Sequence, residues 1–240
     1  MLTLGHPITA RLEAIRQTKT YDLLAAAPLI VWYLLGASQV LPAAVREVAL
    51  IKLFVAADTS SLPVTLILSA ISKICSLAFL TVLIVTFAAR RPPKRRAYGF
   101  YPRFVALVGT WLTVGIVQLP RQQISAELYF VSLILLIAGT AFAAYSAIAL
   151  ARSISILPEA RRLVTRGPYS LVRHPLYLGE FVATTGLAIQ FLMPWALILL
   201  GLHCFFQFER MRNEEQVLIR AFENYREYMS RTARLLPGLY

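Results

Sequence analysis

The feature that most constrains this chain is a series of apolar stretches, each close to the length that a helix needs to cross a membrane. A helix crosses about 30 Å of hydrocarbon with roughly 20 mostly apolar residues. Four stretches of this kind lie at about 23–41, 63–89, 104–119 and 128–150. A soluble domain of this length is excluded by the composition, since 58% of the 240 residues are hydrophobic and only 15% are charged. The sequence predicts an all-α, polytopic membrane helix bundle.

A fifth apolar stretch, residues 176–208, is too long for one ordinary span. Met193 and Pro194 lie near its middle, and proline breaks or kinks a helix interior. We therefore expect a tight hairpin of two arms, each about 16 residues or roughly 24 Å long. This gives about six transmembrane helices. A C-terminal helix with an apolar stripe follows them on the cytoplasmic side.

Two shorter segments predict helices that do not cross the membrane. Residues 1–22 are too charged for a cleaved signal peptide, and their spacing of Leu12, Ile15 and Lys19 indicates a short interfacial helix. The apolar segment 46–57 is only 12 residues long, which indicates a re-entrant or surface helix on the outer side. We divide the chain into an N-terminal membrane region, 1–150, and a region 151–240 that concentrates the polar motifs.

The distribution of basic residues predicts the orientation. Of the 24 Lys and Arg residues, 20 lie in the N-terminal segment, in the loops after the second and fourth spans, or in the tail. Cytoplasmic loops carry such an excess, so both termini are expected on the cytoplasmic side of a bacterial inner membrane. The net charge of +12 is explained by anionic lipid headgroups rather than by nucleic acid. Three scattered histidines predict no metal site.

Polar residues gather first in residues 158–180. Gly167-Pro168 favours a turn, and Pro175 stands where a helix can begin, because its missing N–H has no partner there. A helix start offers free N–H groups and a positive dipole end, which hold a carboxylate or a phosphate. His174 lies directly before this helix start. Glu180, inside the membrane, is costly unless it is paired or functional.

The second polar cluster, residues 209–215, follows the predicted hairpin directly. A hairpin returns to the side that it left, so residues 210–215 are expected beside residues 173–177. Arg210 and Glu214 share one side of a helix. The alternative interpretation is a basic juxtamembrane loop with interfacial tyrosines and a surface ion pair worth about 0–1 kcal/mol.

Together the clusters resemble the isoprenylcysteine carboxyl methyltransferase family and its phospholipid methyltransferase relatives. The similar residues are Leu-Val-Thr-x-Gly-Pro-Tyr-x-x-x-Arg-His-Pro-x-Tyr-x-Gly at 163–179, Arg-x-x-x-Glu-Glu at 210–215, and Tyr-x-x-Tyr at 225 and 228. The resemblance covers about residues 150–236, whereas residues 1–120 match by hydropathy only. It implies an integral membrane enzyme that uses S-adenosylmethionine to methylate a carboxylate of a prenylated or other lipidic acceptor. Region 151–240 would then be the catalytic, cofactor-binding region.

The resemblance also implies residue roles. Arg210 and Glu214 would be catalytic, with Arg210 facing the methyl acceptor and Glu214 holding the cofactor. The implied cofactor-binding residues are Arg161, Leu163, Val164, Gly167, Tyr169, His174, Pro175, Leu176, Tyr177, Glu214 and Glu215. Arg161 stands where the family often has histidine.

The chemistry agrees with these roles. Methyl transfer from a sulfonium is an in-line displacement that needs positioned reactants and excluded water. Tyrosine faces attract such a cation by about 0.5–2 kcal/mol. Glu214 would suit the cofactor's ammonium, and the Pro175 helix start or Arg161 its carboxylate. An apolar tunnel between the spans would admit the acceptor from the bilayer.

Three alternatives remain open at the level of sequence. A phospholipid N-methyltransferase would use Arg210 to bind a phosphate and would need a deprotonated amine. An NADPH-dependent membrane reductase of the sterol type carries a similar Arg-His-Pro-x-Tyr-x-Gly segment, but the Glu214-Glu215 pair favours a methyltransferase. A transporter should place polar groups at mid-membrane on several spans, and the first four spans offer few. The acceptor and the oligomeric state are left undetermined.

Overall fold

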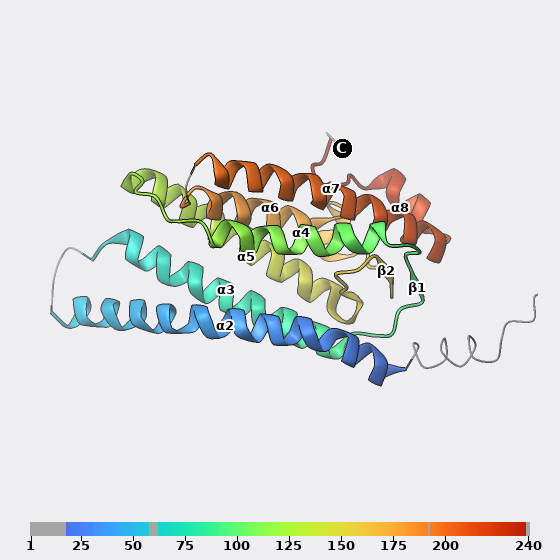
Figure 1. The fold of residues 1–240 in the computed structure, drawn as a ribbon, viewed down its shortest axis with the longest axis horizontal. Helices are drawn as coiled ribbons and strands as arrows, with labels where there is room; N and C mark the ends of the chain where they lie inside the picture. The colour runs from blue at the N-terminus through green and yellow to red at the C-terminus, as the bar shows by residue number, and fades with distance from the viewer. Residues whose placement is uncertain (1–17, 58–61, 192, 239–240) are drawn as a thin grey trace, which may run out of the picture.

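The computed structural model describes residues 18–57, 62–191 and 193–238. Most of the predicted interfacial helix lies outside these residues. Six helices run alternately in opposite directions between the two ends of an elongated bundle (Figure 1). They are α2 (Lys19–Ala56), α3 (Val64–Ala89), α4 (Tyr101–Val117), α5 (Ala126–Leu150), α6 (Pro175–Ala188) and α7 (Trp195–Ala221). The predicted all-α membrane bundle is confirmed.

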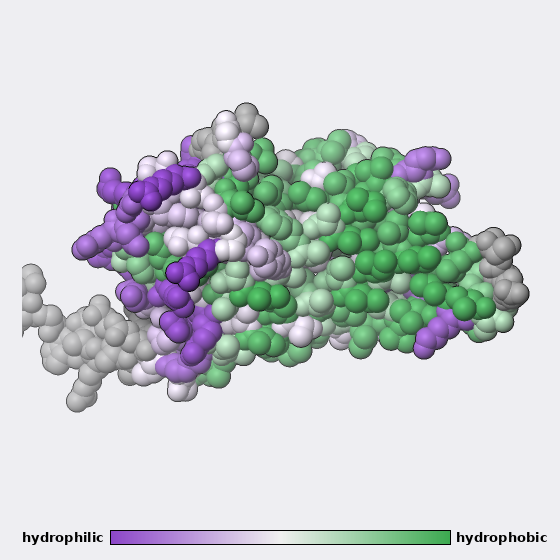
Figure 2. Space-filling view, turned by 180° about the vertical axis from the view of Figure 1, so that it is seen from behind, coloured by the Kyte–Doolittle hydropathy of each residue, from purple (hydrophilic) through white to green (hydrophobic). Residues whose placement is uncertain are grey.

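One end of the bundle, which we call the basic end, holds the starts of α2, α4 and α6 and the last residues of α3, α5 and α7 (Figure 1). The short helix α8 (Tyr225–Arg231) lies at this end too. Hydrophilic residues gather there, while the sides of the bundle are largely apolar (Figure 2). Leu24 and Val55 are each 68% exposed on α2. Such a surface suits contact with lipid.

Within the described residues, three helices are long and apolar enough to cross a membrane: α2, α3, and α5 with the turn after it. Helix α4 is also apolar but shorter, at 17 residues. Helices α6 and α7 form the predicted hairpin, because α6 ends at Ala188 and α7 begins directly after Met193-Pro194.

The expected separate helix at 46–57 is wrong, because α2 continues through Pro42 to Ala56 as one helix of 38 residues. Its C-terminal part packs along α3, where Glu47 accepts a 2.7 Å hydrogen bond from Nζ of Lys73 and a 3.0 Å bond from the Ser69 hydroxyl. The polar residue that interrupts the second span is therefore paired with the first. At 1.5 Å per residue α2 measures about 57 Å, longer than the hydrocarbon core of a bilayer.

Helices α5 and α6 pack closely through small residues. A Cβ atom added to Gly179 would lie 2.6 Å from the backbone nitrogen of Ala143, and one added to Gly186 would lie 2.6 Å from the carbonyl oxygen of Ser132. Small residues allow helix backbones to approach in this way. The close contact fixes the position of α6, and with it the position of His174 at the start of this helix.

A two-stranded antiparallel ribbon at the basic end joins two loops. Strand β1 (Arg95–Arg96) lies between α3 and α4, and strand β2 (Glu159–Ala160) follows the 3₁₀ turn η1 (Ala151–Ser153). Arg95 pairs with Ala160, and Arg96 with Glu159. A second 3₁₀ turn, η2 (Gly167–Ser170), contains the predicted Gly-Pro turn. The polar loop 151–174 is therefore held against the loop before α4.

Candidate functional site

The α6–α7 hairpin brings the two polar clusters together. The Tyr177 hydroxyl donates a 3.0 Å hydrogen bond to Oε2 of Glu214. The guanidinium of Arg210 lies 5.1 Å from the centre of the Tyr177 ring. Residues 210–214 and residues 174–177 therefore face one another across the hairpin, as the sequence predicts.

A pocket opens at the basic end between these clusters and the loop 153–164. Nine of the twelve predicted site residues line it: Arg161, Leu163, Val164, Tyr169, His174, Leu176, Tyr177, Arg210 and Glu214. The structure does not bring the other three into its lining. Pro175 is buried at the start of α6, Gly167 lies in a neighbouring groove at a φ of 63°, and Glu215 bonds to the lining residues Arg173 and His174 without lining the pocket itself.

Sequence reasoning missed several residues in the lining. Tyr225 and Tyr228 of α8 reach the pocket, and the Tyr228 hydroxyl donates a 2.6 Å hydrogen bond to the carbonyl oxygen of Tyr169. Their Tyr-x-x-Tyr spacing was the available signal. Tyr33 of α2 and Phe87 of α3 also line the pocket. Nothing distinguishes these two from other aromatic residues in an apolar span.

Glu215 binds three basic side chains, from the start of α6 and from the tail. Its carboxylate lies 2.9 Å from Nε of Arg173, 3.1 Å from Nε2 of His174 and 2.6 Å from Nη2 of Arg234. Burial alone would raise the pKa of this carboxyl, but the hydrogen bonds from His174 and Arg234 lower the pKa to about 2. Glu215 therefore fastens the tail and the His174 loop to α7.

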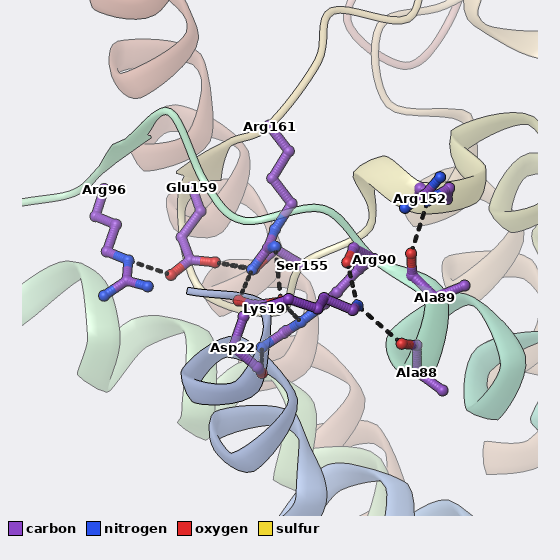
Figure 3. A network of polar contacts seen from close by, with 10 residues as sticks. All are labelled: Lys19, Asp22, Ala88, Ala89, Arg90, Arg96, Arg152, Ser155, Glu159 and Arg161. Carbon is purple, nitrogen blue, oxygen red and sulfur yellow. Dashed lines mark hydrogen bonds and ion pairs between the residues drawn. The ribbon is translucent and has the colours of Figure 1, made fainter. Parts of the chain in front are cut away.

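Arg161 is fully buried within a network of charges (Figure 3). Its Nη2 atom lies 2.9 Å from Oδ1 of Asp22 and 2.6 Å from Oε2 of Glu159. Asp22 also accepts a 2.9 Å hydrogen bond from Nε of Arg90. Among the described residues, Nε of Arg161 has no hydrogen-bond partner. The arginine that replaces the family histidine thus joins the start of α2 to β2 and leaves one buried donor.

A second cavity lies inside the bundle and continues the pocket toward the middle of the helices. Five residues line both: Tyr33, Leu83, Ile156, Glu180 and Arg210. The remaining walls come from every long helix, mostly as aliphatic, aromatic and threonine side chains. The pocket at the basic end is therefore connected to an interior cavity between the spans.

Gln207 links the two charges at the junction of the cavities. Nη1 of Arg210 donates a 2.7 Å hydrogen bond to the amide oxygen of Gln207. The amide nitrogen of Gln207 donates a 2.6 Å hydrogen bond to Glu180. Glu180, which a membrane interior would otherwise disfavour, is thus compensated. In the described part of the chain, Nε of Arg210 is a buried donor without a partner. A ligand at the junction that accepts a hydrogen bond would satisfy this N–H group.

Comparison with known proteins supports the resemblance in this same part of the chain. Residues 128–225 match the family model for phospholipid methyltransferase. The protein-S-isoprenylcysteine O-methyltransferase of Dictyostelium discoideum is 34% identical over 80 residues, 32% of this chain and 34% of that one. The enzyme of the same name from Xenopus laevis is 39% identical over 82 residues, 33% of this chain and 28% of that one.

A relative with a different name matches equally well. The nickel-cobalt-cadmium resistance protein NccN of Alcaligenes xylosoxydans xylosoxydans is 37% identical over 82 residues, 34% of this chain and 38% of that protein. The chain thus spans about a third of the length of the curated relatives it matches. In the described residues, no group of three or more His, Cys, Asp or Glu side chains is placed to hold a metal ion. The predicted resemblance to the isoprenylcysteine carboxyl methyltransferase and phospholipid methyltransferase family is confirmed by these partial matches, of which the family model covers residues 128–225.

Proposed function

Because residues 128–225 carry the methyltransferase match and build most of the pocket, we propose that the protein is an S-adenosylmethionine-dependent membrane methyltransferase of the isoprenylcysteine carboxyl methyltransferase type. It would transfer a methyl group to a carboxylate of a prenylated or other lipidic acceptor. One observation carries this proposal: a polar pocket and an interior cavity meet at Arg210, a buried cation with an unpartnered donor among the described residues.

The pocket at the basic end fits the methyl donor. S-adenosylmethionine supplies, when bound, a methyl group on a positively charged sulfur. Tyr169, Tyr177, Tyr225 and Tyr228 surround the pocket, and aromatic faces attract cations. Glu214 presents a carboxylate that suits an ammonium group. Both terminal nitrogens of Arg161 donate hydrogen bonds to Asp22 or Glu159. Only Nε of Arg161 therefore remains to bind the carboxylate of S-adenosylmethionine.

The interior cavity fits a lipid-like acceptor. Its walls would enclose an apolar chain that enters from the bilayer, while Nε of Arg210 would bind the acceptor's carboxylate. Tyr177 contacts both Arg210 and Glu214, so it lies between the acceptor end and the donor end of the site. Enclosure by the helices would also exclude water from the reacting groups.

Phospholipid N-methylation is the second candidate, and Glu180 favours it. This carboxylate lies at the same junction as Arg210, so the two would match the ammonium and the phosphate of a zwitterionic headgroup. The amine must lose its proton before it accepts a methyl group, and Glu180 is the adjacent group able to receive that proton.

The deciding experiment uses the purified full chain with methyl-tritiated S-adenosylmethionine and either an S-farnesylcysteine derivative or phosphatidylethanolamine. Base treatment releases volatile methanol from a methyl ester, while an N-methyl group stays on the lipid. We expect base-labile label on the farnesylated acid. The variant Arg210→Met/Glu180→Gln, which removes both charges together, should lose this label and still bind the donor. Absence of donor binding by the intact protein in calorimetry would refute the methyltransferase proposal.

We propose further that the basic end lies on the cytoplasmic side of a bacterial inner membrane. The support is the concentration of arginines at that end and the apolar sides of the bundle. A reporter enzyme that works only in the cytoplasm should be active when it is fused to the C-terminus. Activity of a reporter that works only in the periplasm would contradict this orientation.

A further inference from the structure

A second groove opens at the basic end and shares the segment 162–164 with the pocket. Four exposed arginines line it: Arg91, Arg152, Arg162 and Arg166. Its other lining residues are apolar, hydroxyl-bearing or glycine: Tyr145, Ala149, Leu150, Ala151, Ser153, Leu163, Val164, Thr165, Gly167 and Pro168. The groove thus gathers four positive charges and contains no acidic side chain in its lining.

These four arginines differ in their partners from three buried or half-buried arginines of the same loops. Arg90, Arg161 and Arg173 each form an ion pair with a buried carboxylate. Over the described ranges, the four arginines of the groove form none. Like charges brought together repel one another, so an anion bound between them would stabilise the folded protein.

Part of the groove is held in place by hydrogen bonds. Nε of Arg152 donates a 2.8 Å bond to the carbonyl oxygen of Ala89 (Figure 3). The backbone N–H of Arg91 donates a 2.9 Å bond to the carbonyl oxygen of Arg152. The end of α3 and the turn after α5 are therefore hydrogen-bonded to each other, and this holds Arg91 close to Arg152. Arginine binds phosphate oxygens through paired N–H groups, which makes phosphate the ligand class that this cluster suits.

The position of the groove identifies the source of the phosphate. Tyr145, on the last turns of α5, lines the groove and is 54% exposed. Ile148 of the same helix is 58% exposed. The groove therefore lies where an apolar helix surface meets the basic end, the level at which lipid headgroups sit and interfacial tyrosines concentrate. We propose that it binds the phosphate of an anionic phospholipid whose acyl chains lie along α5.

Such a lipid would also support the pocket. Leu150, Ser153, Arg162, Leu163 and Val164 line both the groove and the pocket. A phosphate bound to Arg162 and Arg166 would restrain the segment between them. Three of the four arginines, Arg91, Arg152 and Arg166, lie outside the pocket lining, and the existence of the lipid site does not depend on the methyltransferase proposal.

The test measures lipid binding by the purified full chain in neutral detergent, by native mass spectrometry and by thermal unfolding. The groove variant is Arg91→Gln/Arg166→Gln. The control variant Arg103→Gln/Arg226→Gln removes the same charge from exposed positions at the same end, outside the groove. Phosphatidylglycerol should bind and raise the unfolding temperature, whereas phosphatidylcholine should not. We expect affinity for phosphatidylglycerol to fall at least tenfold in the groove variant and less than twofold in the control.

Three results would overturn the proposal. Equal losses in both variants would show diffuse attraction to the basic end, and equal binding of phosphatidylcholine would show that charge is not recognised. Stabilisation by millimolar inorganic phosphate equal to that by phosphatidylglycerol would identify a site for free phosphate. If the double variant does not fold, Arg166→Gln against Arg226→Gln gives the same comparison.

Discussion

The hydroxyl of Tyr177 donates a 3.0 Å hydrogen bond to Glu214, whereas the adjacent Glu215 accepts a 2.9 Å hydrogen bond from Nε of Arg173 and is not part of the pocket lining. Successive residues on a helix point about 100° apart, so neighbouring carboxylates can serve different surroundings. Glu214 lines the pocket, and Glu215 binds Arg173, His174 and Arg234. Similar substitutions at the two positions should therefore have different effects.

Glu214→Gln is expected to weaken binding of S-adenosylmethionine about 10- to 100-fold, because a hydrogen bond to a charged group contributes about 1.5–3 kcal/mol. The unfolding temperature should change little, since within the described residues Tyr177 is the one hydrogen-bond partner of this carboxylate. Calorimetry of the purified protein measures the affinity. Wild-type affinity in this variant would remove Glu214 from the donor site.

Glu215→Gln is expected to lower the stability by about 3 kcal/mol, because it leaves buried cations without their counterion. The pKa of Glu215 lies near 2 when folded, below the ordinary value of 4.5. Its charge therefore stabilises the fold above about pH 4.5, and this stabilisation disappears as the pH falls through 2. The gap in unfolding temperature between wild type and variant should narrow from pH 7 to pH 3. A constant gap over this range would contradict the assignment.

Asp22→Asn is expected to destabilise the protein by about 3–5 kcal/mol, because Arg90 and Arg161 would lose their shared buried carboxylate (Figure 3). Glu227→Gln is the control, since Glu227 pairs with Arg231 at a surface where the two side chains are 63% and 75% exposed. That change should cost about 0–1 kcal/mol. Denaturant unfolding in detergent compares the two, and equal effects would contradict the central role of Asp22.

Gly179→Ala is expected to push α6 away from α5, because the new methyl group would lie 2.6 Å from the backbone nitrogen of Ala143. Overpacking of this kind costs about 1–3 kcal/mol. Gly201→Ala on α7 is the matched control, since no heavy atom lies within 4 Å of its added Cβ. The control should be neutral or stabilising, because alanine favours a helix. Thermal unfolding of both variants checks this, and a neutral Gly179→Ala would show that the helices adjust.

The sequence predicted the spans and the hairpin because membrane crossing depends on length and hydropathy, which are local properties. Lys73 shows where this reasoning stops. It is a charged residue inside the apolar stretch 63–89, and it pairs with Glu47, which lies within residues 46–57 of α2. A pairing across 26 residues depends on tertiary packing that hydropathy does not encode. The division into regions 1–150 and 151–240 stays a prediction.

The site was predicted to a similar extent. The hairpin argument correctly brought Arg210 and Glu214 to Tyr177, because chain reversal fixes which ends meet. It did not separate Glu214 from Glu215, because that depends on the rotation of α7 about its own axis. Arg161 was expected to contact the cofactor, but its terminal nitrogens bind Asp22, 139 residues away in sequence. The roles assigned to the site residues stay predictions.

The interior cavity takes several of its walls from residues that precede the family match. Trp32 and Tyr33 of α2, with Phe79 and Leu80 of α3, line it, whereas the match begins at residue 128. In the proposed enzyme, exchanging these four wall residues between relatives should therefore change which lipid is accepted. Tyr33 also lines the pocket at the basic end, so a change there should reach the donor site as well.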